Sequence, residues 1–463
     1  MSIAVLKAPS LRMRVFHLAW PVILEGLLQT TLGIVDTIMV GRLGADALAG
    51  VGTSQQFLFF LIAILSAVSI GSSIMAAQAV GARDWSTARR IAKQSLLWAL
   101  AIAAPLAILG SIFSHSLLQM MGVTNSVAAI GGNYLGITML TGIVLVVPFT
   151  AGGVLRGAGD TRTPLYATLC ANIVNAIVAY GLIFGAFGLP ALGATGSAWG
   201  AASGRLVSCA ILLVALWHGR VGLTIRGWSG WRPERELVRR VIALGAPAAL
   251  EQFAMSAGFL ALIVIVARLG TESLAAQPIV GTLLSVSFLP GFGFGIAATA
   301  LVGQSVGARK PDEGEKATVI AAQWAAMWMA AFGMIFVFLR TPLVSIFTND
   351  PAVIDLAAQC MIPLGLTQPL WAIGIVASGA LRGSGNTRYP LVMTCLQIWG
   401  TVILAVITTE VFHAGLVVVW AGFIISSPLN AYFLWRRFRR GDWKDKARDP
   451  ARIAENDAVL EPV

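Results

Sequence analysis

The sequence predicts an all-α integral membrane protein with twelve transmembrane helices arranged as two parallel six-helix repeats. Its 463 residues are 57% hydrophobic and 11% charged, whereas an ordinary soluble domain is about 25% charged. Apolar runs of 18 or more residues recur along the chain, and each can cross about 30 Å of hydrocarbon as a helix. In addition, one constant shift in numbering, the repeat shift, aligns the two halves and carries Glu25 onto Glu251 and Gly44 onto Gly270.

The apolar runs define the predicted spans in order. They lie near residues 15–40, 51–79, 95–113, 127–149, 164–188, 193–217, 241–266, 277–303, 318–339, 354–380, 389–412 and 415–435. The first polar and basic stretch is not followed by a short apolar core with a cleavage site, so no signal peptide is expected and the first span is retained.

These spans divide the chain into five predicted segments. They are a cytoplasmic N-terminal segment (1–14), an N-terminal bundle (15–217), a basic linker (218–240), a C-terminal bundle (241–435) and a cytoplasmic tail (436–463). Of the 32 Lys and Arg residues, 28 fall in the termini and in alternate loops. The positive-inside rule therefore predicts a multi-pass protein of the cell membrane with both termini in the cytoplasm.

Two of these segments carry dense basic charge. The linker has six basic residues interleaved with Trp228 and Trp231; this pattern is compatible with RNA but favours an anionic membrane surface beside a transmembrane bundle. The tail after Trp435 begins with a basic cluster and becomes polar, so it is expected to be disordered.

Three motif pairs establish the repeat. RLGADALA (42–49) matches RLGTESLA (268–275), QAVGAR (78–83) matches QSVGAR (304–309), and LRGAGDTRTP (155–164) matches LRGSGNTRYP (381–390). Six spans per repeat return the chain to its starting side, so both halves have the same orientation, as in alternating-access transporters. The third pair is interpreted as a cytoplasmic turn, with Arg156 and Arg162 keeping it on the positive side.

Acidic residues inside predicted spans are the main functional candidates. Glu25 and Asp36 lie in the first span, and the repeat places Glu251 opposite Glu25 and Leu262 opposite Asp36. A charge in hydrocarbon costs roughly 2.5–3.5 kcal/mol, so such residues usually have a role. A desolvated carboxylate can exchange a proton or bind Na⁺. The alternative for both glutamates is a protonated, hydrogen-bonded group that joins helices.

Other polar residues at depth are candidates for a hydrated cavity or for interhelical hydrogen bonds. Arg205, near the middle of the sixth span, is expected to form an ion pair within the first half, with Glu25 or Asp36. The candidate cavity residues are Gln29, Gln55, Asn172, Asn175 and Tyr180.

Several motifs in the sequence resemble those of a known transporter family. DTIMVGRLG, QAVGAR and the paired LRGxG[DN]TRxP segments resemble the bacterial multidrug and toxic compound extrusion (MATE) family over all twelve spans. The resemblance implies a V-shaped pair of bundles and cation-coupled export of organic, often cationic, compounds. It also implies that Asp36 is the coupling aspartate, with Gln29 and Asn175 in the N-terminal cavity and Glu251 in the second cavity.

The chain departs from the family pattern at two positions. Some members have an aspartate where this chain has Ala179, and another where it has Trp371. The first difference weakens the N-terminal site, and the second puts a complete C-terminal sodium site in doubt. Glu25 is not an expected family position, although the repeat pairs it with Glu251.

Other functions match the sequence less well. A lipid-linked-precursor flippase of related fold is the main alternative, although it would be expected to have more basic cavity residues; a passive channel is another. There is no HExxH and no Walker A motif, so a zinc hydrolase or ATPase is not expected. The predicted partners are small organic substrates and the bilayer, without nucleic acid, ATPase subunit or cofactor, and the chain is expected to be monomeric. The coupling ion, H⁺ or Na⁺ (the latter held by Asp36 or Glu251), is left open.

Overall fold

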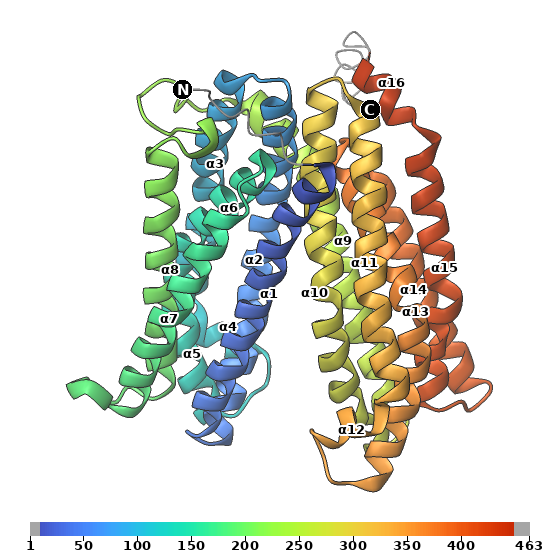
Figure 1. Cartoon of the computed structure of the whole chain (residues 1–463). Helices are drawn as coiled ribbons and strands as arrows, with labels where there is room; N and C mark the ends of the chain where they lie inside the picture. The colour runs from blue at the N-terminus through green and yellow to red at the C-terminus, as the bar shows by residue number, and fades with distance from the viewer. Residues whose placement is uncertain (1–9, 449–463) are drawn as a thin grey trace, which may run out of the picture. The chain divides into compact units, whose positions relative to one another are not determined.

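The computed structural model describes residues 10–448, and this part of the chain is helical without strands (Figure 1). Twelve of its helical segments are long and apolar enough to cross a membrane. The prediction of an all-helical protein with twelve spans is therefore confirmed. The predicted N-terminal segment (1–14) and tail (436–463) lie partly outside the described residues.

The helices follow the predicted spans closely. The first half contains α1 (Leu11–Gly41), α2 (Ala45–Gly81), α3 (Trp85–Ile112), α4 (Ser114–Met120), α5 (Asn125–Thr141), α6 (Val146–Ala158), α7 (Arg162–Phe184) and α8 (Ala194–Trp217). The second half contains α9 (Arg235–Ala267), α10 (Thr271–Gly307), α11 (Pro311–Phe338), α12 (Arg340–Ser345), α13 (Pro351–Gly383), α14 (Arg388–Glu410), α15 (Leu416–Arg440) and α16 (Asp442–Arg448).

The repeat extends to backbone geometry. The bounds of α2 and α10, of α3 and α11, and of α7 and α14 are related by the repeat shift at both ends. Arg83 and Arg309, which end the QxVGAR motifs, both adopt a left-handed conformation, with φ of 58° and 57°. Gly159 and Gly385 have φ of 98° and 90° in the LRGxG motifs. Such conformations favour glycine, so the sequence specifies the turns at Gly159 and Gly385.

The fourth predicted span (127–149) is broken in the structure. α5 ends at Thr141, a short 3₁₀ segment follows (η1, Gly142–Leu145), and α6 begins at Val146. Pro148 has no amide hydrogen and lies in the first turn of α6, where a helix tolerates proline. Pro148 therefore explains why the α-helix restarts here. In the second half the equivalent helix, α13, is continuous.

The described chain divides into two compact units. One consists of residues 10–23 with 250–448, and the other of residues 24–249. The boundaries fall inside α1 and α9, each of which contains a proline close by, Pro21 and Pro247. The first unit has one large hydrophobic core, and the second has several smaller ones.

The linker (218–240) packs on α3 within the second of these units. Lys93 Nζ donates hydrogen bonds to the carbonyls of Arg226, Gly227 and Ser229 at 2.9, 3.0 and 2.7 Å. Lys93 is only 4% exposed. One buried ammonium group thus fixes this part of the linker, while the Trp228 side chain is fully exposed.

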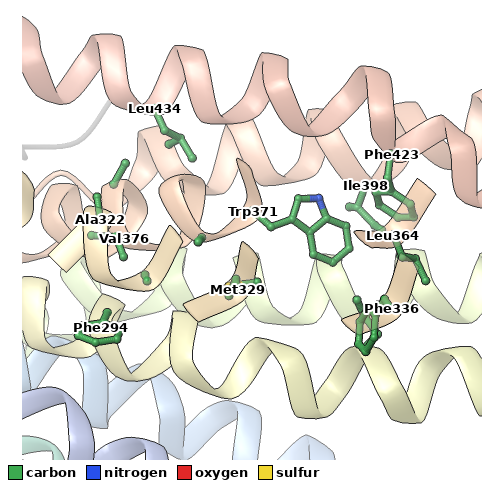
Figure 2. Close-up of a cluster of buried hydrophobic side chains, with 14 of the residues drawn as sticks. Phe294, Ala322, Met329, Phe336, Leu364, Trp371, Val376, Ile398, Phe423 and Leu434 are labelled. Atoms are coloured by element: carbon green, nitrogen blue, oxygen red, sulfur yellow. The ribbon is translucent and has the colours of Figure 1, made fainter. Parts of the chain in front are cut away.

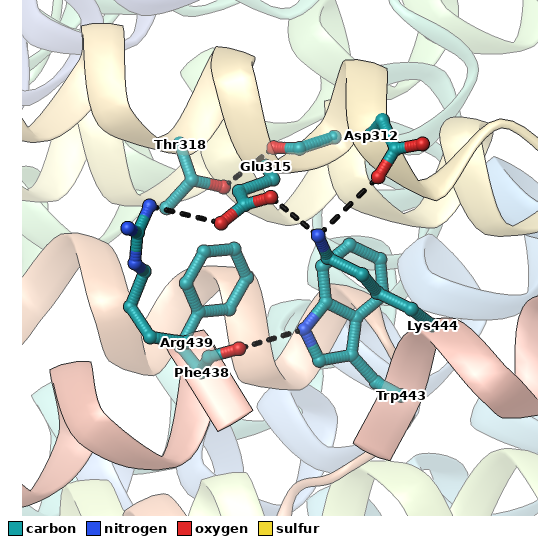
Figure 3. Close-up of polar contacts among 8 residues, drawn as sticks. Asp312, Glu315, Thr318, Phe438, Arg439, Trp443 and Lys444 are labelled. Carbon is teal, nitrogen blue, oxygen red and sulfur yellow. Dashed lines mark hydrogen bonds and ion pairs between the residues drawn. The ribbon is translucent and has the colours of Figure 1, made fainter. Parts of the chain in front are cut away.

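The start of the tail is ordered, so the expectation of disorder after Trp435 is wrong for residues 436–448. α15 continues to Arg440, and α16 follows a turn at Gly441. Figure 3 shows that Glu315 on α11 contacts both Arg439, at 2.9 Å, and Lys444. Trp443 stacks on Phe438 with ring centroids 5.3 Å apart. The basic residues Arg439 and Lys444 thus pair with an acidic residue on a helix that is distant in sequence. Residues 449–463 lie outside the described part of the chain.

The close contact between α13 and α10 can be tested by substituting a glycine. At Gly379 of α13, an added Cβ would lie 2.3 Å from the carbonyl oxygen of Gly295 on α10, whereas a Cβ at Gly400 of α14 would meet no atom within 4 Å. We expect Gly379→Ala to lower the unfolding temperature in detergent because two backbones must separate. Gly400→Ala should leave it unchanged or raise it slightly, since alanine favours helix. Equal effects of the two substitutions would contradict this packing.

Candidate functional site

The candidate site of the first half is centred on Asp36, near the C-terminal end of α1. Its carboxylate interacts electrostatically with the side chain of Asn175 on α7 and with Arg205 on α8. Asn175 is only 4% exposed. Asp36 Oδ1 and Asn175 Oδ1 are both buried without a hydrogen-bond partner in the described chain. Unpaired buried acceptors are costly, so the site is suited to receive a proton or a cation.

Arg205 is held by α5 and not by a carboxylate. Its Nη1 donates to the carbonyl of Thr138 at 3.2 Å and to Thr141 Oγ1 at 3.1 Å. The carbonyl is available because the amide of Gly142, at the break after α5, bonds to residues 139 and 140. Irregular backbone at membrane depth commonly offers such free carbonyls.

The predicted ion pair of Arg205 with Glu25 or Asp36 is therefore wrong. Neither carboxylate lies within 4.0 Å of the guanidinium in the described structure. Glu25 has another partner, and Asp36 interacts with Arg205 at longer range. The physical reason is that α5 supplies neutral acceptors within reach of the arginine.

The other predicted cavity residues divide into two groups. Tyr134 on α5 interacts electrostatically with Asp36 and Arg205, and Gln55 on α2 interacts with Tyr134. Asn172 instead donates to the carbonyl of Leu28 at 2.7 Å, which ties α7 to α1.

Two predicted residues do not join the cluster. Tyr180 is 46% exposed and packs against Phe184 and Phe187, with ring centroids 5.3 and 6.2 Å away. Gln29 is exposed and forms no hydrogen bond with the Asp36 cluster in the described chain. Tyr134 was not among the candidates predicted from the sequence. The only indication was that it is a tyrosine within an apolar span.

The two glutamates form equivalent clamps. Arg156 Nη1 lies 3.3 Å from both carboxylate oxygens of Glu25, and Thr168 donates to Oε1 at 3.3 Å. The repeat shift converts this set into Glu251, Arg382 and Thr394.

In the second half, Arg382 Nη1 lies 3.4 Å from Glu251 Oε2, and Thr394 donates to Oε1 at 3.0 Å. Ser378 adds a hydrogen bond at 3.2 Å. The four charged side chains of the two clamps are between 11% and 20% exposed. Each clamp joins three helices: α1, α6 and α7 in the first half, and α9, α13 and α14 in the second.

Sequence reasoning places Arg156 and Arg382 in topology-setting loops, but both lie in the last turn of a helix. The sequence repeat could have predicted these ion pairs, because the glutamate and the arginine of the first half both recur in the second half at the same shift in numbering. A duplicated pair of opposite charges near apolar spans indicates a contact, since neither charge is stable there alone.

The second half contains an open cavity with about 810 Å³ of empty space, a figure that includes solvent outside its walls. It is lined by the Glu251 clamp, by amide side chains, including those of Gln397 and Asn430, and by aromatic rings. The rings of Phe288 and Phe423 lie 4.4 and 5.0 Å from the ring of Trp371. Figure 2 shows Trp371 and Phe423 within the hydrophobic cluster that forms this wall.

The second half lacks the charges found around Asp36. Leu262, at the position of Asp36, is 1% exposed and belongs to the hydrophobic core, and Ala431 stands at the position of Arg205. No group of three or more His, Cys, Asp or Glu residues that could hold a metal ion occurs in residues 10–448. The two halves thus share their clamps but differ in their candidate sites.

The clamps can be tested by a double-mutant cycle. A buried charge without its partner is destabilising by about 3–5 kcal/mol, while removal of both charges costs less. We therefore expect Glu251→Gln and Arg382→Gln each to lower the unfolding temperature, and the double variant to recover part of the loss. The same cycle on Glu25 and Arg156 should behave alike. Additive losses in either cycle would show that the pair is not coupled.

Comparison with known proteins gives consistent matches. The family model described as MatE matches residues 21–181 and again residues 247–407, and the two matches are related by the repeat shift. A probable multidrug resistance protein NorM from Thermotoga maritima is 30% identical over 449 residues, which cover 95% of each chain. The multidrug resistance protein NorM from Burkholderia vietnamiensis is 31% identical over 395 residues, covering 83% of this chain and 84% of the relative.

Solved structures share the fold. A MATE protein in a straight conformation superimposes with a TM-score of 0.88 at 23% identity, covering 94% of this chain and 98% of that one. A MOP superfamily transporter from Pyrococcus furiosus gives 0.83 at 21% identity, with 95% and 97% covered. With twelve spans, a twofold repeat and these matches, the chain belongs to the multidrug and toxic compound extrusion (MATE) family, whose members are membrane transporters and not enzymes.

Proposed function

We propose that this chain is a secondary antiporter that exports organic, amphipathic and cationic compounds in exchange for inward-moving H⁺ or Na⁺ by alternating access. The observation that carries the proposal is the unpaired carboxylate oxygen of Asp36, buried in a membrane-spanning helix beside Asn175. The relatives named as multidrug resistance proteins support the choice of substrate. The charge distribution supports a location in the cell membrane with both termini in the cytoplasm.

Asp36 is the principal coupling residue in this proposal. Of the three membrane-embedded carboxylates Glu25, Asp36 and Glu251, it alone has no arginine within ion-pair distance in the described chain. Glu25 and Glu251 act mainly as clamps, and their part in coupling is secondary. When an ion binds at Asp36 and lowers the affinity for the drug, the drug must lower the affinity for the ion by the same factor.

The membrane potential can supply part of the energy. One charge that moves inward through about 100 mV releases roughly 2.3 kcal/mol, which supports about a 40-fold concentration gradient. One-for-one exchange of H⁺ with a monovalent cationic drug would be electroneutral and could use only the ion gradient. Measuring transport with the potential clamped would separate the two cases.

The second-half cavity is our proposed substrate site. Its aromatic wall and its few polar side chains suit an amphipathic organic molecule, since ligand pockets are commonly lined by apolar and aromatic groups with a small number of polar groups. A cationic group is attracted to the face of an aromatic ring, which Trp371 and Phe288 provide. The lipid-precursor alternative is less well supported, because the arginine of this cavity is already paired with Glu251.

We expect Asp36→Asn to abolish ion-driven efflux of a fluorescent organic cation from energised inverted vesicles, because the amide can neither accept a proton nor balance Na⁺. Glu251→Gln should retain measurable transport at lower stability. Glu410→Gln, which removes an exposed carboxylate paired with Arg268, serves as the matched control and should transport normally. Full ion-driven efflux by Asp36→Asn would refute the assignment of the coupling residue.

The substrate site has its own test. Trp371→Leu introduces the residue found at the equivalent position 145 of the first half. Loss of ring stacking and cation–π attraction should weaken binding of a planar organic cation by about tenfold. Trp328→Leu, at an exposed tryptophan of α11, is the control. Titration of the fluorescent cation onto purified protein measures both, and equal affinities would argue against this cavity.

A further inference from the structure

A groove between α14 and α15 bears on how substrates reach the second-half cavity, and this inference rests on the substrate site proposed above. The two helices pack side by side, and the groove runs along their contact (Figure 1). We propose that the groove is a lateral entrance through which amphipathic organic cations pass from the bilayer into the cavity. Gln397 of α14 and Asn430 of α15 form the gate between the groove and the cavity.

The walls of the groove are apolar and face lipid. Leu396 and Ile403 of α14 and Ile425 and Leu429 of α15 line the groove, and each of these side chains is between 53% and 63% exposed. Large apolar side chains that are exposed on a membrane-spanning helix contact hydrocarbon. Along α14 the lining extends over residues 393–407, which is about 21 Å at 1.5 Å per residue. The apolar part of a molecule dissolved in the bilayer can therefore lie in the groove.

The groove and the cavity meet at two amide side chains, because Gln397 and Asn430 line both of them. Asn430 Nδ2 donates a hydrogen bond to Gln397 Oε1. Gln397 Nε2 donates to the hydroxyl oxygen of Ser427, a cavity residue, at 3.2 Å. The two amides thus form a partition between lipid and cavity. Their contact is uncharged, so it can open without the separation of opposite charges that breaking an ion pair in hydrocarbon would require.

The gate lies near the middle of its two spans and keeps one acceptor unused. Gln397 is the tenth of the 23 residues of α14, and Asn430 is the fifteenth of the 25 residues of α15. Asn430 Oδ1 is buried and has no hydrogen-bond partner in the described chain. A buried acceptor without a partner is costly, and a protonated amine carries N–H groups that can satisfy it. A cation in transit would therefore make its first polar contact at the gate.

The equivalent helices of the first half, α7 and α8, pack tightly. Gly196, Gly200 and Gly204 recur every four residues on α8, and a Cβ added to any of them would lie 2.5–2.6 Å from an atom of α7. Small residues at this spacing let two helices in a membrane pack backbone to backbone. This interface therefore leaves no space for a molecule to pass at the level of these glycines.

The second half has larger residues at the same level. The repeat shift converts the three glycines of α8 into Gly422, Ser426 and Asn430, and converts Ala171 of α7 into Gln397. A Cβ added to Gly422 would lie 3.3 Å from the nearest atom of α14, so the backbones are further apart there. Side chains thus replace a backbone contact, and the amide pair fills the space where the helices of the first half touch.

The entrance is tested with two organic amines that share a cationic head and differ in the length of an alkyl chain, so that one dissolves mainly in water and the other in lipid. Gly400→Phe fills the groove, because Gly400 lines it and an added Cβ there meets no atom within 4 Å. In proteoliposomes of the full-length protein, we expect this variant to slow efflux of the long-chain amine about tenfold relative to the short-chain amine. The short-chain amine can enter through the open mouth of the cavity, and partial loss of folded protein does not change the ratio of the two rates.

The matched control is Val406→Phe, which adds a ring at an exposed position of α14 that does not line the groove. It should leave the ratio of the two rates as in the wild type. If Gly400→Phe slows both amines equally, or slows neither, the groove is not an entrance and the inference is overturned. If the wild type expels neither amine under a pH gradient or a Na⁺ gradient, the proposed function itself fails.

Photolabelling of the wild type gives a readout that depends neither on transport nor on the folding of a variant. The probe is the long-chain amine with a diazirine at the end of its chain, added to liposomes that contain the full-length protein. We expect labelled peptides to concentrate in residues 393–407 and 422–433. The equivalent faces of α7 and α8, residues 167–181 and 196–207 by the repeat shift, are the internal control.

Equal labelling of the two halves would show that the amine does not prefer the groove and would overturn the inference. Labelling of the groove by a neutral photoreactive lipid but not by the amine would assign it to an acyl chain, and this result would also overturn the entrance. Either result would leave the proposed antiport intact.

Discussion

A carboxylate within a membrane-spanning helix is unstable without a partner, because hydrocarbon provides neither water nor counter-ions. Both halves of this protein meet that constraint in the same way, with an arginine from the end of α6 or α13 placed against the glutamate of α1 or α9. Threonines 168 and 394 supply a further hydrogen bond in each case. Because each clamp joins three helices, it positions the first helix of its half and the groups carried on it.

With the glutamates neutralised, the chemical differences between the halves become clear. The first half places an aspartate and an arginine close together without a direct ion pair and leaves acceptors unsatisfied around them. The second half replaces those charges with leucine and alanine and surrounds its cavity with aromatic rings. The same scaffold thus supports a polar site in one copy and a largely apolar cavity in the other. In our proposal, ion exchange and substrate binding are divided in the same way.

The sequence predicted the twelve spans well because apolar run length is a local property, and the repeat determined their grouping. Features that depend on distant contacts were not predicted. The pairing of Arg156 with Glu25 joins residues 131 positions apart, and the order of α16 depends on Glu315 of another helix. The break before α6 was not predicted, although Pro148 lies there in the sequence, and neither was the carbonyl that binds Arg205. Asn175 beside Asp36 was expected from the family resemblance, whereas Tyr180 faces elsewhere.

The separation of each clamp along the chain affects how the protein is made. At about 5–20 residues per second, the ribosome produces Arg156 roughly 7–26 s after Glu25, and Arg382 follows Glu251 by the same interval. During that time the nascent helix carries a carboxylate whose partner does not yet exist. The contact that joins the first helix of each half to α6 or to α13 can therefore form only after that later helix has been made. Until the arginine has been made, each glutamate therefore lacks the ion pair that it has in the folded protein.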